Sequence, residues 1–396
     1  MRETDVILLG AGIASSIAAY ILRTKGYRVT IISRDQGTQY HLPESWIYSI
    51  KSLKKLGLEN KVGSSIKNDN KCSFFSANGS VKLQISTKDY SNEIQEGDLV
   101  RVDRNIFDQI LLKNALEEGA SLIGSSRILD CQINFNEITV FVDTQEGHQE
   151  IKSQYIIDGT GKSAFLSQHL NLPNKQAKLD SRVAYFTHYE SDTPIISEGI
   201  SIIAIESGYL FCIPITDRRM SIGCVIAEHS INPQETPDSI YANAIAKSSL
   251  VSRLIENAKQ VLPIIITAKN QSSICLKPAG DRYRVIGDAA AFLDPFFCPG
   301  IDFAFFSAEL AVQTIIENNP VLYQESLMNW LKIENRSVYE KMEQVSWRAI
   351  VRLFADPHLP IVVPLFLTQA FSQIVNRETS LYEGIQIARE AYAKAN

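Results

Sequence analysis

The sequence predicts a mixed α/β fold, and three observations carry this prediction. Residues 6–9 form a short apolar run before a glycine, residues 13–24 have a helical pattern, and residues 28–32 form a β-branched run. A long β-rich stretch covers residues 183–226, and the chain after Gly300 is mostly helical in pattern. Short buried strands that alternate with helices are typical of a parallel sheet covered by helices.

The elements between these regions follow from local signals. Asp103 is a typical N-cap, and apolar residues at helical spacing follow it until Gly119 ends the segment. Turn signals at Glu198-Gly199 and Ser207-Gly208 divide the later β-rich stretch. Further strands are expected near residues 128–133, 138–142, 151–157 and 284–286.

Composition and charge exclude several functional classes. The 396 residues are 45% hydrophobic and 21% charged, which is ordinary for a folded globular protein. The net charge is −5 and no long Lys/Arg run occurs, so we expect neither a nucleic-acid partner nor a membrane partner. Residues 360–375 include prolines and polar residues, and the first apolar run is short. We therefore expect no membrane-spanning helix, no signal peptide and a cytoplasmic location.

The cysteines do not form a metal or disulfide pattern. None stands in a C-x-x-C pair, and no histidine cluster accompanies them, so we expect reduced thiols and no metal site. The six are Cys72, Cys131, Cys212, Cys224, Cys275 and Cys298.

The glycine turn after the first strand carries the strongest local signal. Gly10-x-Gly12-x-x-Ser15 is a variant of the dinucleotide fingerprint, with serine at the position that usually holds the third glycine. The first glycine permits a tight turn, and the second lets the backbone approach a pyrophosphate at a helix N-terminus. The alternative is a glycine turn that binds no nucleotide. The expected ribose carboxylate is replaced by Ser33, followed by Arg34 and Asp35.

A second constellation lies late in the chain. The strand at residues 284–286 leads into Gly287-Asp288 and small residues, and a Pro/Gly turn then opens a helix near Gly300 and Ile301. Small residues suit the close approach of a flat ligand, and a helix N-terminus favours negative charge on it.

These motifs together resemble the flavin-dependent monooxygenase and halogenase superfamily, most closely its tryptophan-halogenase-like branch. The resemblance covers about the first 320 residues, and the order and spacing of the motifs match the family. They are GAGIASSIAAYIL, HLPESW, RVDRNIFDQILL, YIIDGTGKSAF, GYLFCIP and GDAAAFLDPFFCPGI.

The resemblance implies FAD as the cofactor. Gly10, Gly12 and Ser15 would lie at the pyrophosphate, Asp288 would bind the ribityl chain, and Gly300 and Ile301 would face the isoalloxazine ring. Further cofactor contacts are expected from Ser33, Arg34, Glu44, Arg101, Asp158 and Pro295.

The resemblance also implies a domain organisation. We expect a discontinuous Rossmann-like FAD-binding domain from residues 1–75, 96–165 and 276–320. Residues 76–95 and 166–275 would form an inserted, β-rich substrate domain, and residues 321–396 a helical C-terminal region.

Three features bear on halide use. The family's halide-binding turn corresponds to Cys298-Pro299-Gly300, where Pro299 has no backbone N–H to donate. The tryptophan motif of halogenases reads Tyr209-Leu210-Phe211-Cys212-Ile213-Pro214, so both tryptophans are replaced. Phe297 stands where tryptophan halogenases have a glutamate, and neither Lys67 nor Lys71 matches the catalytic lysine convincingly.

These departures favour hydroxylation of an aromatic substrate, such as indole or protein-bound tryptophan, through the C4a-hydroperoxide of the family. Asp302 and His188 are candidate bases, and Tyr209 and Phe211 candidate pocket walls. Asp302 also fits a helix-dipole carboxylate, His188 an ordinary strand histidine, and the aromatic pair one face of a core strand.

Two alternatives stay open: a halogenase, and a non-redox FAD protein such as a cyclase-like isomerase or a binding partner. The resemblance further implies a separate flavin reductase, or a partner protein that carries the substrate, as in the maturation of tryptophylquinone cofactors.

Overall fold

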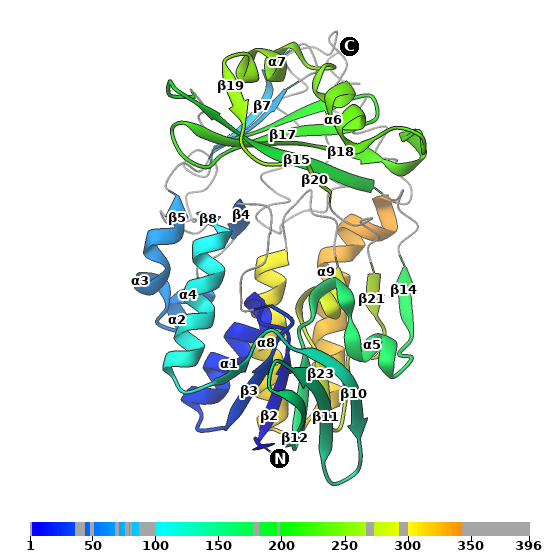
Figure 1. Cartoon of the computed structure of the whole chain (residues 1–396). Helices are drawn as coiled ribbons and strands as arrows, with labels where there is room; N and C mark the ends of the chain where they lie inside the picture. Colours follow the sequence, from blue (N-terminus) through cyan, green and yellow to red (C-terminus); the bar gives the residue numbers. More distant parts are fainter. Residues whose placement is uncertain are drawn as a thin grey trace. The chain divides into compact units, whose positions relative to one another are not determined.

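The computed structural model describes residues 2–35, 44–47, 51–67, 71–75, 79, 81–86, 100–176, 182–195, 199–266, 273–292 and 300–342. The chain divides into two compact units, each built from alternating segments of the sequence (Figure 1). Unit 1 comprises Met1–Lys67, Gly97–Gln176 and Ser272–Trp330. Unit 2 comprises Asn68–Glu96, Ala177–Gln271 and Leu331–Asn396.

A six-stranded sheet forms the centre of unit 1. Its strands lie in the order β22 (Ala279–Gly280), β23 (Tyr283–Val285), β13 (Tyr155–Asp158), β2 (Val6–Leu9), β3 (Val29–Ile32) and β9 (Ser121–Ile123). All neighbouring pairs are parallel except β22 with β23. The four residues of β2 are fully buried, as expected for a strand covered on both faces. The predicted α/β class and Rossmann-like topology are therefore confirmed.

The predicted βαβ unit is present at the N-terminus. Helix α1 (Ile13–Thr24) joins β2 to its parallel neighbour β3, and its Ile17, Ala18 and Leu22 are fully buried. Helix α1 packs against α4 (Arg104–Glu117) and α8 (Gly300–Ile316). Asp103 caps α4 as predicted, because its carboxylate accepts hydrogen bonds from the N–H groups of Asn105 and Ile106.

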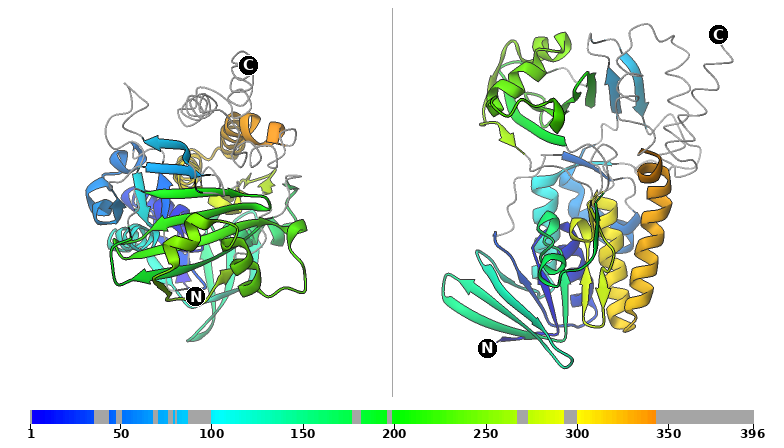
Figure 2. Two further views of the ribbon diagram at one scale, coloured as in Figure 1. Left: turned by 90° about the horizontal axis from the view of Figure 1, so that it is seen from above. Right: turned by 90° about the vertical axis from the view of Figure 1, so that its right-hand side faces the viewer.

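Smaller elements complete unit 1. A four-stranded sheet, β1-β12-β11-β10, stands to one side of the helices in the right-hand view of Figure 2. The bounds are β1 (Arg2–Glu3), β10 (Arg127–Ile133), β11 (Ile138–Thr144), β12 (Gly147–Ser153), β4 (Glu44–Ile47), β5 (Ile66–Lys67), β8 (Val100–Asp103), β14 (Asn174–Gln176), β21 (Ser273–Cys275) and β24 (Ala291–Phe292). The helices are α2 (Lys51–Lys55), α3 (Glu59–Val62), α5 (Phe165–His169) and the short η1 (Gly63–Ser65), η2 (Gly161–Ser163) and η4 (Gly287–Ala289). Helix α9 (Pro320–Met342) follows α8.

Unit 2 is built on an eight-stranded sheet, which matches the β-rich pattern of its sequence. The strand order is β19 (Ala258–Gln260), β15 (Arg182–Ser191), β18 (Arg219–Ala227), β17 (Gly208–Pro214), β16 (Ile200–Ile205), β6 (Lys71–Phe75) and β7 (Val81–Ser86). Strand β20 (Ile265–Ile266) also pairs with β15. Helices α6 (Pro237–Ile245) and α7 (Ser249–Ile255) and the short η3 (Glu228–Ser230) complete the unit.

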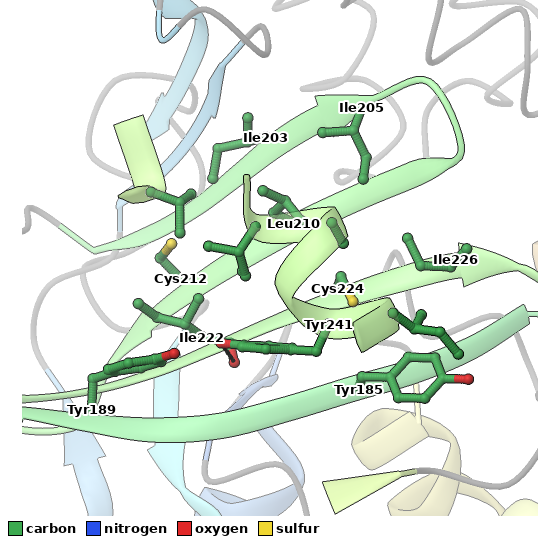
Figure 3. Packing of buried hydrophobic residues seen from close by; sticks show 14 of the residues in the cluster. Tyr185, Tyr189, Ile203, Ile205, Leu210, Cys212, Ile222, Cys224, Ile226 and Tyr241 are labelled. Carbon is green, nitrogen blue, oxygen red and sulfur yellow. Dashed lines mark hydrogen bonds between the residues drawn. The ribbon is translucent and has the colours of Figure 1, made fainter. Parts of the chain in front are cut away.

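One face of this sheet carries the hydrophobic core of unit 2. Tyr185, Leu210, Cys224 and their neighbours pack against Tyr241 and other residues of α6 (Figure 3). Alternate residues of a strand point to opposite faces, so the intervening positions form a second face. We call it the Phe211 face, and its members are Ala184, Phe186, His188, Tyr209, Phe211, Ser221 and Gly223.

The described residues include no helix that is long and apolar enough to cross a membrane. Within the same residues there is no His/Cys/Asp/Glu group able to hold a metal ion. Cys131, Cys212, Cys224 and Cys275 are buried free thiols.

Candidate active site

The glycine turn after β2 brings two loops of unit 1 together. Gly10 has φ +86°, and a Cβ atom there would stand 2.6 Å from the carbonyl oxygen of Gly159, in the loop after β13. Only glycine fits this combination of backbone conformation and close approach. Gly12 precedes α1, and a Cβ atom built on it meets no atom within 4 Å. The N-terminus of α1 therefore faces open space, as an anion-binding helix end requires.

Ser15 lies on the inner side of this turn. It is fully buried, and its hydroxyl lies 3.4 Å from the carbonyl oxygen of Leu9. A Cβ atom on Gly159 would overlap the same hydroxyl. Serine thus replaces the usual third glycine because Gly159 leaves room for it, and its predicted contact with the pyrophosphate stays a prediction.

Asp158 organises the neighbouring loop from inside. Its fully buried carboxylate accepts hydrogen bonds from the N–H of Thr160 (2.9 Å), the hydroxyl of Thr160 (2.6 Å) and the N–H of Leu166 (2.7 Å). Burial raises the pKa of Asp158, while these hydrogen bonds oppose the rise. The carboxylate holds the Gly159–Gly161 loop in shape, and its predicted FAD contact is untested.

Asp288 lies in η4, which follows β23. Its carboxylate receives no hydrogen bond from the described residues, and burial raises its pKa against the influence of Lys162 and Arg104. A Cβ atom on Gly300 would stand 4.0 Å from its Oδ1 atom. A half-buried carboxylate beside a glycine at the start of α8 suits a ligand that brings hydroxyl groups.

Two cations accompany Asp288, and sequence reasoning missed both. The ammonium of Lys162 lies 4.1 Å from the centroid of the Phe292 ring, and burial lowers its pKa. Arg104 holds Asp108 through two hydrogen bonds of 2.9 and 2.8 Å. Lys162 lies inside the motif YIIDGTGKSAF, so its position directly after the glycine turn of this motif was the available signal.

The other residues that were predicted to contact the cofactor lie in several elements of unit 1. Ile301 is buried in the first turn of α8. Ser33 is buried at the end of β3, whereas Arg34 is exposed and pairs with Asp35 at 3.3 Å. Glu44 and Arg101 belong to the neighbouring strands β4 and β8, of which only the backbone is described at these two positions. Pro295, together with Phe297, Cys298 and Pro299, lies outside the described residues.

The predicted catalytic residues fall in both units. Asp302 belongs to the first turn of α8 in unit 1. His188, Tyr209 and Phe211 share the Phe211 face of unit 2, where the ring of Phe211 covers Gly223 beside Phe186. Lys67 lies in β5 and Lys71 in β6, where only their backbone is described.

His188 differs from the base that its sequence position suggested. Burial and the nearby Arg219 lower the pKa of its imidazole to about 4. The ring is therefore neutral at physiological pH, and it is a weak proton acceptor. Such a histidine is better suited to hydrogen bonding than to removing a proton from a phenol.

Comparison with known proteins shows the family and its cofactor. A family model described as "FAD binding domain" matches residues 3–309. The chain belongs to this FAD-binding family, within the flavin-dependent monooxygenases and halogenases. The open end of α1 and the carboxylate of Asp288 beside Gly300 fit FAD, the cofactor of the family. The family comprises FAD-dependent halogenases and monooxygenases, which are enzymes of the oxidoreductase type.

Individual relatives are more distant. Tryptophan 2-halogenase of Chondromyces crocatus is 25% identical over 79% of this chain and 61% of its own length. A 1H-pyrrole-2-carbonyl-[peptidyl-carrier protein] chlorinase of Pseudomonas fluorescens is 24% identical over 80% of this chain and 76% of its own length. The chain thus spans less than two thirds of the first of these relatives.

A solved structure confirms the fold over the whole chain. The flavoprotein/dehydrogenase of Cytophaga hutchinsonii superimposes with a TM-score of 0.82 at 17% identity, and the match covers 100% of both chains. At this level of identity the likeness establishes the fold alone.

Proposed function

We propose that the protein is a flavin-dependent halogenase of an electron-rich aromatic substrate. The observation that carries this proposal is that both relatives described above are named as halogenases of aromatic rings and align over about four fifths of this chain. The relatives reverse the preference for hydroxylation that the sequence motifs suggested.

The chain's own residues supply the binding sites that this function needs. Gly10, Gly12 and the start of α1 would receive the pyrophosphate of FAD, and Asp288 would receive hydroxyl groups of its ribityl chain. Reduced FAD supplies the activation of oxygen when it is bound. The Phe211 face offers aromatic side chains for contact with the ring of the substrate.

Hydroxylation is the second candidate, and Pro299 favours it. A proline in the halide-binding turn removes one N–H donor that halogenases of this family use. Pro299→Ser restores the donor. If bromide use appears only in this variant, the missing N–H explains the difference and hydroxylation is the natural reaction.

Product analysis tests the proposal. FAD-loaded protein, a flavin reductase with NADH, and air are incubated with tryptophan, indole, phenol and pyrrole, with and without bromide. Mass spectrometry then distinguishes brominated products from products that contain oxygen from labelled oxygen gas. Brominated products are expected. If only oxygenated products form, the protein is a hydroxylase and the proposal of halogenation is wrong.

We propose a substrate bound to a carrier protein as the alternative to a free substrate. The chlorinase named above acts on a pyrrole held by a peptidyl carrier protein. The same incubation with substrate loaded on a carrier protein tests this form. A separate reductase as the source of electrons is likewise part of the proposal, tested by omitting it.

A further inference from the structure

The Phe211 face contains polar atoms that the protein itself does not satisfy. His188 on β15 lies directly opposite Ser221 on β18, which in turn lies opposite Ile213 on β17. Both ring nitrogens of His188 and the hydroxyl of Ser221 are buried, and none has a hydrogen-bond partner in the part of the chain that the structure describes. Ser221 is 0% exposed.

Some similar buried groups are paired, whereas the hydroxyls of Ser16 and Ser167 also lack a partner among the described residues. The Nε2 atom of His169 lies 2.6 Å from the carbonyl oxygen of Cys131. Ser307, also fully buried, accepts a hydrogen bond from the N–H of Gly287 and donates one to the carbonyl oxygen of Ala304. Buried polar groups normally have such partners, because leaving them unpaired is unfavourable. The Phe211 face is distinguished by bringing two such groups directly opposite each other on adjacent strands, and this juxtaposition suits a ligand that pairs with both.

The chemistry of the two groups defines what the ligand must offer. The neutral imidazole of His188 has one donor and one acceptor nitrogen, and the hydroxyl of Ser221 serves as either. The Nε atom of Arg219, two positions from Ser221, is also buried without a partner. A hydroxyl or ring N–H group of a ligand can pair with these donors and acceptors. The positive charge of Arg219 favours a ligand group with acidic character.

Aromatic side chains adjoin the polar pair on the same face. The rings of Phe186 and His188 lie 6.5 Å apart between centroids at an angle of 36°. Gly223 lies two positions after Ser221 on β18, between Phe186 on β15 and Phe211 on β17. Both phenylalanine side chains lie within 3 Å of the position that a Cβ atom on Gly223 would take. The face thus combines an apolar surface for a ring with hydrogen-bonding groups at one side.

We propose that His188 and Ser221 form a specificity-determining pair that binds the hydroxyl or N–H group of the aromatic substrate. The pair positions the substrate through this group while Phe186 and Phe211 contact the ring. This inference rests on the proposed function, because it assumes an aromatic substrate.

Equilibrium dialysis of the FAD-loaded protein tests the pair with two matched probes. 4-Nitrophenol offers a hydroxyl group, and 4-nitroanisole is the same ring with that group methylated. We expect the phenol to bind about tenfold more tightly, which is the usual effect of pairing a buried polar group. Ser221→Ala and His188→Phe are expected to remove this preference by weakening phenol binding, with anisole binding changed by less than about twofold.

Conservative and distant variants separate recognition from folding. His188→Gln keeps a donor and an acceptor, so it is expected to retain part of the preference. His148→Phe, at an exposed position, and Ser252→Ala on α7 are matched controls that should retain all of it. Thermal melting of each variant shows whether it is folded.

Three results would overturn the inference: equal binding of the two probes to the wild type, no binding of either probe, or an unchanged preference in both variants. The outcome is separable from that of the proposed function. Product formation without probe discrimination would refute the pair alone. Probe discrimination without any oxidised or halogenated product would refute the proposed function alone.

Discussion

Ser15 and Gly159 share one small volume between α1 and the loop after β13. The hydroxyl of Ser15 occupies the position that a Cβ atom on Gly159 would take. We expect Gly159→Ala to lower the free energy of unfolding by about 1–3 kcal/mol, because overpacking forces neighbouring groups apart. Ser15→Ala in the same chain should restore most of this loss. Denaturant unfolding of the double-mutant cycle measures the coupling, and additive effects would show that the two residues do not compete for this space.

The same substitution should have a large effect on stability at one buried serine and a small effect at another. Ser307→Ala leaves the N–H of Gly287 without its acceptor, so it should cost about 1–3 kcal/mol of unfolding free energy. Ser221→Ala removes a hydroxyl that has no partner, so its cost should stay within about 0.5 kcal/mol. Chemical denaturation measures both values. A large loss for Ser221→Ala would mean that its hydroxyl is satisfied in the folded protein.

At the scale of residues, the sequence supports predictions of backbone position better than of side-chain contacts. The Gly10 turn and the placement of Asp288 after a strand follow from spacing. The inward direction of Ser15 does not, because it depends on Gly159, far along the chain. The unpaired state of His188 likewise depends on the strand opposite it.

Arg284 connects three elements of unit 1 through a fully buried guanidinium. It donates hydrogen bonds to the carbonyl oxygens of Gly280 (2.6 Å), Tyr283 (2.8 Å) and Thr314 (3.0 Å). Thr314 lies in the last turn of α8, whose carbonyl groups favour a cation. The hydroxyl of Tyr323 on α9 donates to the carbonyl oxygen of Val285 on the same strand, β23, at 2.7 Å.

Removing this cation should loosen the contact between β23 and α8. Arg284→Met removes three hydrogen bonds to backbone carbonyl groups, and we expect it to cost roughly 3 kcal/mol of unfolding free energy. Arg253→Met is the matched control, since Arg253 donates to Ser249 within one exposed helix turn. The control should change stability by less than about 0.5 kcal/mol. Equal effects of the two substitutions would contradict a structural role for Arg284.

At the scale of elements, local patterns predicted what lies close in the sequence. The βαβ unit and the cap of α4 at Asp103 are confirmed, because apolar periodicity and capping residues act over a few positions. The parallel pairing of β6 with β16 was not predictable in this way. It joins segments more than a hundred residues apart, and neither strand alone specifies its partner.

At the scale of the whole molecule, the residues suited to FAD belong to unit 1, although they come from separate segments of the chain. FAD binding should therefore stabilise that unit by linkage. At a hundredfold excess over the dissociation constant, the melting temperature should rise by roughly 5–10 °C.

Gly12→Val should abolish this rise, because its side chain fills the open space at the N-terminus of α1. Calorimetry of both proteins with and without FAD measures the effect. An undiminished rise in Gly12→Val would show that FAD does not bind at this helix end. The melting temperature of the FAD-free variant serves as the control for folding.

The central claim is that halide takes part in the reaction. The most direct measurement follows flavin absorbance after the reduced, FAD-loaded protein is mixed with oxygen at increasing bromide concentration, with nitrate as the ionic-strength control. We expect bromide to speed the return to oxidised flavin until bromide binding saturates, while nitrate has no effect. A time course that is identical at every bromide concentration would contradict halogenation.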